Sequence, residues 1–319
     1  MSSVSSLIYK GLLNPTEIGG GIARILVRNK FISDETAIKT TFKSLLGYEL
    51  NLDCPTTFNE KLQWLKLNDH REIYTTMVDK YRAKQWAANI IGEKYIVPSL
   101  ASWNSAEEID TSILPDRFVL KTNHDQGGVV VCANKNSFDL AVAKKKLSRH
   151  LKRNLYWYGR EWPYLNVRAL VFAEQFLYQS VSDNNITDIE NSALFDYKVL
   201  CFGGKPAFIQ LHKGRGGFHT QDIYDTNWNL TDIVQPDTPL SGTLDPAPEQ
   251  LDEMLELSAR LSEGLPHLRV DWYSTSEGLK LGELTLYDGS GFCRFSNIEH
   301  DRYLGSLIDL SQVSARRNK

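Results

Sequence analysis

Two carboxylates in a predicted hairpin are the residues best suited to chemistry. Asp271 and Glu283 each lie in a short apolar segment, and the turn-forming residues 274–278 separate the two segments. A bare carboxylate is costly to bury, so an acid in such surroundings usually has a cation as its partner. Because the strands of a hairpin can bring these positions face to face, with the Thr285 hydroxyl nearby, the sequence predicts an all-oxygen site that suits Mg²⁺.

A basic residue shares this hairpin with the two acids. Arg269 precedes Asp271 by two positions, which places both side chains on one face of a strand, where the guanidinium could hold an anionic group beside the metal. The alternative interpretation is a surface hairpin with solvated charges. A Gly-Ser-Gly sequence at residues 289–291 adds to the cluster and favours a site.

A second candidate anion site lies at residues 117–133. Two strand-like segments, FVLK and VVVC, are joined by a polar loop that ends in Gly127-Gly128. Such a loop lets backbone N–H groups approach an anion, while Lys121 at the end of the first strand supplies a point charge. No helix follows the glycines, so this is not a Walker loop. The alternative is a plain hairpin with a flexible tip.

The composition limits the classes of partner and cellular compartment. The chain has 319 residues, 42% hydrophobic content and a net charge of −3, with no basic excess that would indicate nucleic acid. Its four cysteines are far apart and form no CxxC pair, which favours buried thiols in a reducing compartment over disulfides or zinc. No transmembrane-length apolar run and no signal peptide is evident, so we expect a cytoplasmic protein.

The first half of the chain is predicted to be mainly helical. Thr57 and Glu60 have capping-box spacing at the start of a helix over residues 56–69, and a second helix over 72–91 carries Lys80. The basic helix over residues 139–153 is typical of a solvated face, with docking of an acidic polymer as the alternative.

The second half is predicted to form strands. Residues 169–178 form a strand that carries Glu174, and residues 196–215 form a hairpin in which Asp196 and Lys198 share one face. An amphipathic helix over residues 249–263 leads back to the acidic hairpin.

The first 45 residues give the weakest signal. Gly19-Gly20-Gly21 precedes the segment IARILVRNKFI, which we expect to be a short amphipathic helix after a linker. A membrane-surface helix is the alternative, so peripheral membrane contact stays open.

Taken in order, these elements resemble the ATP-grasp superfamily. The strings TFNEKLQWLKL, DKYR, IGEKYIVP, LPDRFVLKTNH, DYKVLCFGGKP, RVDWY and GELT are most similar to the teichuronopeptide-biosynthesis-type (TupA-like) ATP-grasp proteins of bacterial polysaccharide clusters, over roughly residues 45–310. The resemblance implies an α+β ATP-grasp fold, in which two α+β subdomains with antiparallel sheets grip ATP between them after an N-terminal helical region. It divides the chain into an N-terminal extension (1–45), a helical region (46–116), a small lid subdomain (117–175) and a C-terminal subdomain with the metal site (176–319).

The resemblance also implies roles for individual residues. Lys198 and Arg269 face the transferred phosphoryl group, and Asp271, Glu283 and Thr285 hold Mg²⁺. Thr285 replaces the asparagine usual in the superfamily, and the TupA-like proteins share this GELT sequence. The implied ATP contacts are the phosphate lysines Lys80 and Lys121, the covering loop Gln126, Gly127 and Gly128, the adenine slot Glu174, Gln175, Phe176 and Leu177, and the ribose acid Asp196.

The function implied is an ADP-forming carbon–nitrogen ligase that uses ATP and Mg²⁺. A substrate carboxylate would form an acyl phosphate, and an amine would displace the phosphate to give an amide. The expected partners are an acidic glycan or uronic-acid acceptor and an amino acid or amine, with the product used in cell-surface polysaccharide or capsule biosynthesis. Two alternatives remain: an ATP-dependent phosphotransferase acting on a sugar hydroxyl, and a glycan-binding protein without turnover.

Overall fold

The structure is a computed structural model that describes residues 32–177, 194–214, 217–311 and 313. The expected linker at residues 19–21 and nearly all of the helix expected after it lie outside the described residues. The elements are α3 (Asp34–Leu46), α4 (Phe58–Asn68), α5 (Ile73–Val78), α6 (Arg82–Ile91), η1 (Glu93–Tyr95), β1 (Ser99–Trp103), β2 (Phe118–Thr122), β3 (Val129–Cys132), η2 (Lys135–Ser137), α7 (Leu140–Leu151), α8 (Tyr156–Gly159), η3 (Trp162–Asn166), β4 (Val171–Gln175), β5 (Asp196–Phe202), β6 (Lys205–Lys213), β7 (Thr220–Asp225), α9 (Leu251–Ser262), β8 (His267–Thr275), β9 (Gly278–Thr285), η5 (Asp288–Gly291) and α10 (Ile298–Ser306).

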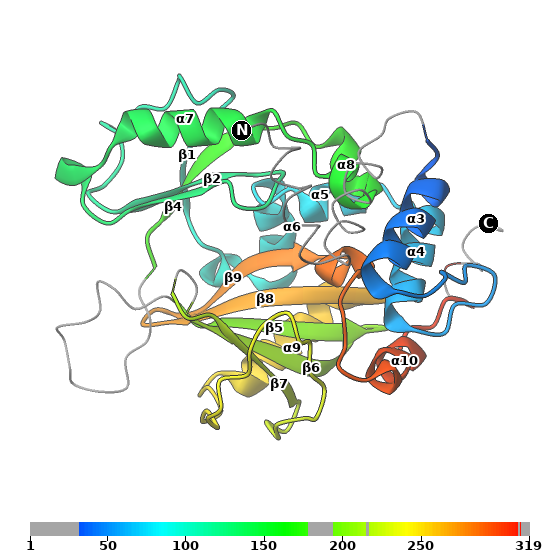
Figure 1. The fold of residues 1–319 in the computed structure, drawn as a ribbon. Coiled ribbons are helices and arrows are strands. Elements are labelled where there is room, and N and C mark those ends of the chain that lie inside the picture. The colour runs from blue at the N-terminus through cyan, green and yellow to red at the C-terminus, as the bar shows by residue number, and fades with distance from the viewer. Residues whose placement is uncertain (1–31, 178–193, 215–216, 312, 314–319) are drawn as a thin grey trace.

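Two antiparallel sheets organise the molecule. The smaller sheet has the order β1-β4-β2-β3, and the larger has the order β7-β6-β5-β8-β9. Figure 1 shows the smaller sheet with α7 on its outer side, the larger sheet with α9 on its outer side, and helices α5 and α6 between them. This arrangement confirms the predicted α+β class with two antiparallel sheets.

Each sheet has its own apolar core. Trp272 of β8 is fully buried in the main core, which joins the larger sheet to α4, α5, α6 and α9. Phe118 and Leu147 lie in a separate core between the smaller sheet and α7. The two sheets are therefore packed as separate units.

The smaller sheet begins earlier in the chain than we expected. Strand β1, residues 99–103, pairs with β4 in antiparallel register, although the lid subdomain was expected to begin at residue 117. Its sequence SLASW has little strand character of its own, so pairing with a strand about seventy residues later along the chain determines its conformation.

One predicted helix is wrong. Residues 72–91 form two helices, α5 and α6, because Asp79 adopts an extended conformation and its carboxylate accepts hydrogen bonds from the backbone N–H groups of Tyr81 (3.0 Å) and Arg82 (3.1 Å). This is N-cap chemistry, which starts a new helix. Lys80 therefore lies in the break between two helices, with its backbone N–H bonded to the Asn123 carbonyl at 2.9 Å.

The predicted acidic hairpin is confirmed. Strands β8 and β9 are joined by residues 276 and 277, and the positive φ of Gly278 (93°) allows the tight reversal. The hairpin over residues 196–215 is likewise present as β5 and β6, whereas β7 was not predicted, because polar residues break its alternation.

Candidate active site

The face of the larger sheet that is directed toward the smaller sheet carries a row of polar side chains. Glu283 of β9 is the register partner of Asp271 of β8, Asp271 is the partner of Lys198 of β5, and Lys198 is the partner of Gln210 of β6. Register partners in neighbouring strands project to the same face. The predicted opposition of the two acids is therefore present.

Arg269 connects three carboxylates in this row. Its Nε and Nη2 atoms donate to the two oxygens of Asp271 at 2.7 and 2.8 Å, and Nη2 also donates to Glu283 at 3.2 Å. Its Nη1 atom donates to Asp288, which also accepts a hydrogen bond from Gln210 at 3.2 Å. Arg269 therefore fixes the geometry of the acids that surround it.

Lys198 is a second buried cation among the acids. Its ammonium lies 3.0 Å from Asp196 and also contacts Asp271, and the side chain is almost completely buried. These two carboxylates offset the cost of burying the ammonium group.

Lys80 approaches the acids from the break between α5 and α6. Its ammonium lies 3.2 Å from Glu283 Oε2 and donates to the Asp125 carbonyl at 3.0 Å. Burial alone would raise the pKa of Glu283, but Lys80, Lys198 and Arg269 hold that pKa well below its usual value. Glu283 is therefore firmly ionised at neutral pH.

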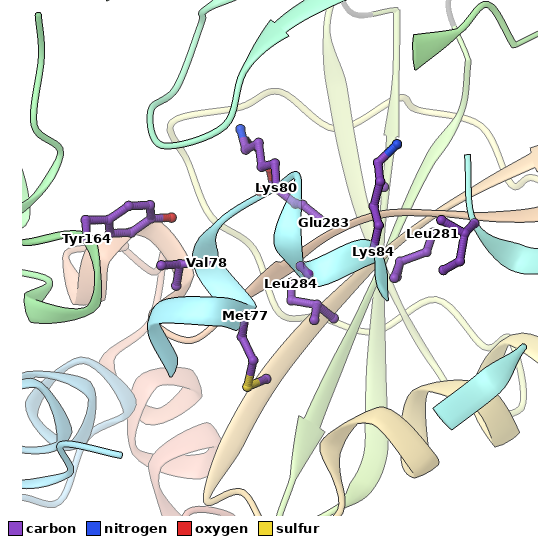
Figure 2. Close-up of a pocket in the computed structure, with 11 residues that line it drawn as sticks. Met77, Val78, Lys80, Lys84, Tyr164, Leu281, Glu283 and Leu284 are labelled. Carbon is purple, nitrogen blue, oxygen red and sulfur yellow. Dashed lines mark ion pairs between the residues drawn. The ribbon is translucent and has the colours of Figure 1, made fainter. Parts of the chain in front are cut away.

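A small pocket lies beside these charged groups, and most of the side chains that line it are apolar. Figure 2 shows Lys80, Lys84 and Glu283 on one side of it, while Met77 and Leu284 lie on the other. Lys84 of α6 and Glu283 of β9 thus lie against apolar side chains, which restrict the conformations of the two charged side chains.

Lys121 and Glu174 form a buried ion pair at the other sheet. Glu174 contacts Lys121 and lies 2.6 Å from the ammonium of Lys84. Burial alone would raise the pKa of the Glu174 carboxyl, but the two lysines lower it below its usual value. In this structure the Glu174 carboxylate orients the ammonium groups of Lys84 and Lys121 and is not exposed to the cleft.

The glycine-containing loop is held by a buried acid. Asp125 accepts hydrogen bonds from Thr122 and from His150 Nδ1 of α7, the latter at 2.5 Å. Gly127 has a φ of 79°, and a Cβ atom at Gly128 would lie 1.8 Å from the Thr122 hydroxyl oxygen. Both glycines are therefore required by the backbone path of this loop.

These groups converge on one cleft of about 580 Å³ between the two sheets. Ten predicted site residues line it: Lys80, Lys121, Gln126, Gly127, Asp196, Lys198, Arg269, Asp271, Glu283 and Thr285. The remaining predicted residues, Gly128, Glu174, Gln175, Phe176 and Leu177, do not line it in this conformation. Their assignment to nucleotide binding stays a prediction.

The loop after β9 has an unusual backbone. Gly289, Ser290 and Gly291 have φ values of 51°, 57° and 64°, and Ser290 carries a side chain that makes this conformation costly by about 1–3 kcal/mol. Ser290 and Gly289 line the cleft. The loop therefore needs support from its surroundings.

Three buried polar residues of α4 provide that support. Asn59 exchanges two hydrogen bonds with the backbone of Cys293, at 2.8 and 2.9 Å. Gln63 donates to the Ser290 carbonyl at 3.1 Å, and Lys66 donates to the same carbonyl at 2.6 Å. Burial lowers the pKa of Lys66 to about 8. Residues 57–67, with the sequence TFNEKLQWLKL, thus stabilise the loop after β9, which forms one wall of the cleft.

Several residues of the site were not predicted from the sequence. Asp288 follows the hairpin directly and could have been noticed as a third acid. Asn59, Gln63 and Lys66 have helical spacing, but their polar side chains give no sign of burial in the sequence, and no spacing signal connects Asp125 to His150.

The donor set fits a magnesium ion that is shared with a nucleotide. Among the described residues no group of three or more His, Cys, Asp or Glu side chains is arranged to hold a metal ion by itself. Magnesium, however, is usually bound by one or two carboxylates together with phosphate oxygens and water. Glu283, about one-third exposed in the cleft, suits that division, while both oxygens of its register partner Asp271 accept hydrogen bonds from Arg269.

The chain matches one protein-family model, described as TupA-like ATPgrasp, over residues 60–309. A search of curated proteins finds no match. Similar solved structures include D-alanine–D-alanine ligase from Bacillus anthracis complexed with ATP (14% identity, TM-score 0.41, 76% of this chain and 67% of that one) and from Helicobacter pylori (14%, 0.42, 79% and 69%). A RimK domain ATP-grasp protein from Sphaerobacter thermophilus is also similar (12%, 0.38, 74% and 69%).

No helix in the described parts of the chain is long and apolar enough to cross a membrane.

Proposed function

The chain belongs to the TupA-like family of ATP-grasp ligases, and from that premise we propose that it joins a carboxylate to an amine with ATP and Mg²⁺. The observation that carries this proposal is that four cations, Lys80, Lys121, Lys198 and Arg269, line one cleft between two sheets together with Glu283. Such a cleft suits a polyphosphate with a bound cation. We further propose a cytoplasmic reaction whose acceptor is a uronic acid of a cell-surface polysaccharide and whose amine is an amino acid.

The residues of the chain bind and orient the reactants. Lys80 and Lys121, which both line the cleft, hold the phosphate chain, with the loop at Gln126 and Gly127 covering it. Glu283, with Asp271 beside it, would hold Mg²⁺, and the ion would supply neutralisation of the phosphate oxygens.

Arg269 and Lys198 act at the transferred phosphoryl group. Their rigid contacts with Asp271 keep both cations directed into the cleft, so little reorganisation is needed as charge develops. The carboxylate oxygen of the acceptor attacks the γ-phosphorus atom and ADP leaves. The amine then attacks the acyl carbon, phosphate leaves, and the amine loses a proton. Exclusion of water by the two sheets protects the acyl phosphate.

A stoichiometric assay tests this function. ADP, phosphate and amide should appear in equal amounts when a uronic acid and an amino acid are supplied together with MgATP. A screen of D-glucuronate and D-galacturonate against the common amino acids, read by coupled ADP release and mass spectrometry, gives the measurement. Formation of a phosphorylated sugar without free phosphate would identify a phosphotransferase instead.

His150 is predicted to control affinity for MgATP. His150→Ala removes the donor that holds Asp125, so the covering loop and the carbonyl that receives Lys80 lose their anchor. Leaving a buried acceptor unpaired costs about 1–3 kcal/mol, and we expect the dissociation constant of MgATP to rise about tenfold.

Titration calorimetry provides this measurement. His150→Asn keeps an N–H donor and should recover part of the affinity, while Arg149→Ala, on the exposed side of the same helix, should bind MgATP like the wild type. Unchanged affinity of His150→Ala would show that the loop holds its shape without this contact.

A further inference from the structure

We propose that the uncharged end of the cleft floor binds the hydroxyl-bearing sugar ring of the acceptor. Gln210, His212, Gln221 and Gln235 form this end, which we call the amide wall. The proposal deepens the proposed function and rests on it, because it assigns a place to the acceptor within the same cleft.

The amide wall continues the charged row across the sheet. Gln210 is the register partner of Lys198, and His212 is the partner of both Asp196 and Gln221, so these side chains project to the same face. The charged residues occupy β9, β8 and β5, whereas the wall occupies β6, β7 and the loop that carries Gln235. The side chains that the larger sheet presents to the cleft are thus charged on β9, β8 and β5, and mainly amides on β6 and β7.

This change separates two kinds of ligand chemistry. Lysine and arginine suit phosphate and carboxylate groups. Amide groups offer both donors and acceptors without a net charge, and hydroxyl groups need the same combination. A ligand that lies along the floor would therefore place an anionic end near Lys198 and a polyhydroxylated part on the amide wall.

Burial of the wall supports a binding role. Gln210, His212 and Gln221 are only 2%, 7% and 6% exposed, although they line a cleft. Polar side chains are costly to bury without partners, and glutamine is usually a surface residue. Two such glutamines and a histidine lie side by side at one end of the cleft, an arrangement that suits a polar ligand.

Hydrogen bonds within the wall orient it in advance. The Gln221 amide donates to Gln235 at 2.8 Å, His212 Nδ1 and His219 Nε2 share a hydrogen bond of 2.9 Å, and the Gln210 amide donates to Asp288. An amide group has two donors and an acceptor oxygen with two lone pairs, so one bond leaves capacity for a ligand hydroxyl. Groups held in this way bind at a lower entropic cost.

The position of the wall also fits the reaction. Neighbouring strands lie about 4.8 Å apart, so a ring bound over β6 and β7 lies one to two strand spacings from Lys198. A carboxylate carried by that ring can extend toward Lys198 and Arg269, where the phosphoryl group is transferred. The amide wall is therefore placed to present the acceptor carboxylate to the γ-phosphate.

The test uses D-glucuronate as the probe, in the presence of Mg²⁺ and a non-hydrolysable ATP analogue. Saturation-transfer NMR on the wild-type protein should show transfer to the sugar ring protons. Gln221→Leu keeps the size of the side chain and removes its amide, and should weaken glucuronate binding by about tenfold or more while binding MgATP like the wild type. Gln235→Leu, at a half-buried loop position, provides a second variant if Gln221→Leu does not fold.

Gln85→Leu is the matched control, because Gln85 is exposed on α6 outside the main cleft. It should bind both ligands normally. The inference is overturned if the wild-type protein binds MgATP but shows no transfer to the sugar ring, or if the folded wall variants bind glucuronate unchanged. Failure of the wild-type protein to bind MgATP would instead count against the proposed function itself.

Discussion

Glu283→Gln is expected to abolish ADP formation while the protein remains folded. The substitution keeps the shape and hydrogen-bonding capacity of the side chain but removes the charge that would hold Mg²⁺ and orient Lys80. Loss of one transition-state contact typically lowers kcat by about 10² to 10³, and loss of a main metal ligand lowers it further. Coupled ADP release with the wild-type substrates measures the effect.

The structure changes our expectation for the stability of this variant. From the sequence we expected stability without metal to hold or increase, because Asp271 and Glu283 would repel each other. Lys80 and Arg269 contact Glu283 and lower its pKa, so the ionised carboxylate is stabilising. Glu283→Gln should therefore lower the free energy of unfolding by about 1–3 kcal/mol.

The matched control is Glu256→Gln, at an exposed position of α9. It should change neither ADP release nor stability. Activity of Glu283→Gln within tenfold of the wild type would refute the assignment of Glu283 as a metal ligand and would favour a purely structural ion pair.

Arg269→Met is expected to have the largest effect on stability. Asp271, Asp288 and Glu283 all contact this guanidinium, and its removal leaves mutually repelling carboxylates in a largely buried cluster. Breaking a buried ion pair by removal of one partner costs about 3–5 kcal/mol. Urea unfolding of the metal-free protein should show this decrease, and ADP formation should be lost as well.

Two further variants separate charge from geometry. Arg269→Lys restores the charge without the bidentate contact, so it should recover part of the stability but little of the activity. Arg294→Met removes an exposed arginine that pairs with Asp237, and should cost no more than about 1 kcal/mol. A loss below 1 kcal/mol for Arg269→Met would mean that the cluster does not depend on this cation.

The features of the site that could be predicted from the sequence depend on residues close together in the chain. Asp271 and Glu283 could be placed opposite each other because strand periodicity and a glycine-containing turn fix the register of a hairpin. The same reasoning placed Asp196 and Lys198 on one face of β5. The capping box at Thr57 and Glu60 was correct because it depends only on residues three apart.

The parts that were not predictable depend on contacts between distant segments. Nothing in the sequence marks Asn59 and Lys66 as buried, and only the packing of α4 against the loop after β9 shows that they are. The pairing of β1 with β4 and the contact between Asp125 and His150 are likewise tertiary. The break at Asp79 was not predicted, because the helical pattern continues on both sides of it.

The most direct test of the central claim is the fate of the acceptor's carboxylate oxygen. Carboxyl-¹⁸O-labelled D-glucuronate is incubated with the enzyme, MgATP and the amine that the screen identifies. If an acyl phosphate forms, one ¹⁸O atom per turnover should appear in the released phosphate, detected by mass spectrometry or by the isotope shift in ³¹P NMR. Amide formation with unlabelled phosphate, or ADP formation with the phosphoryl group retained on the sugar, would contradict the account.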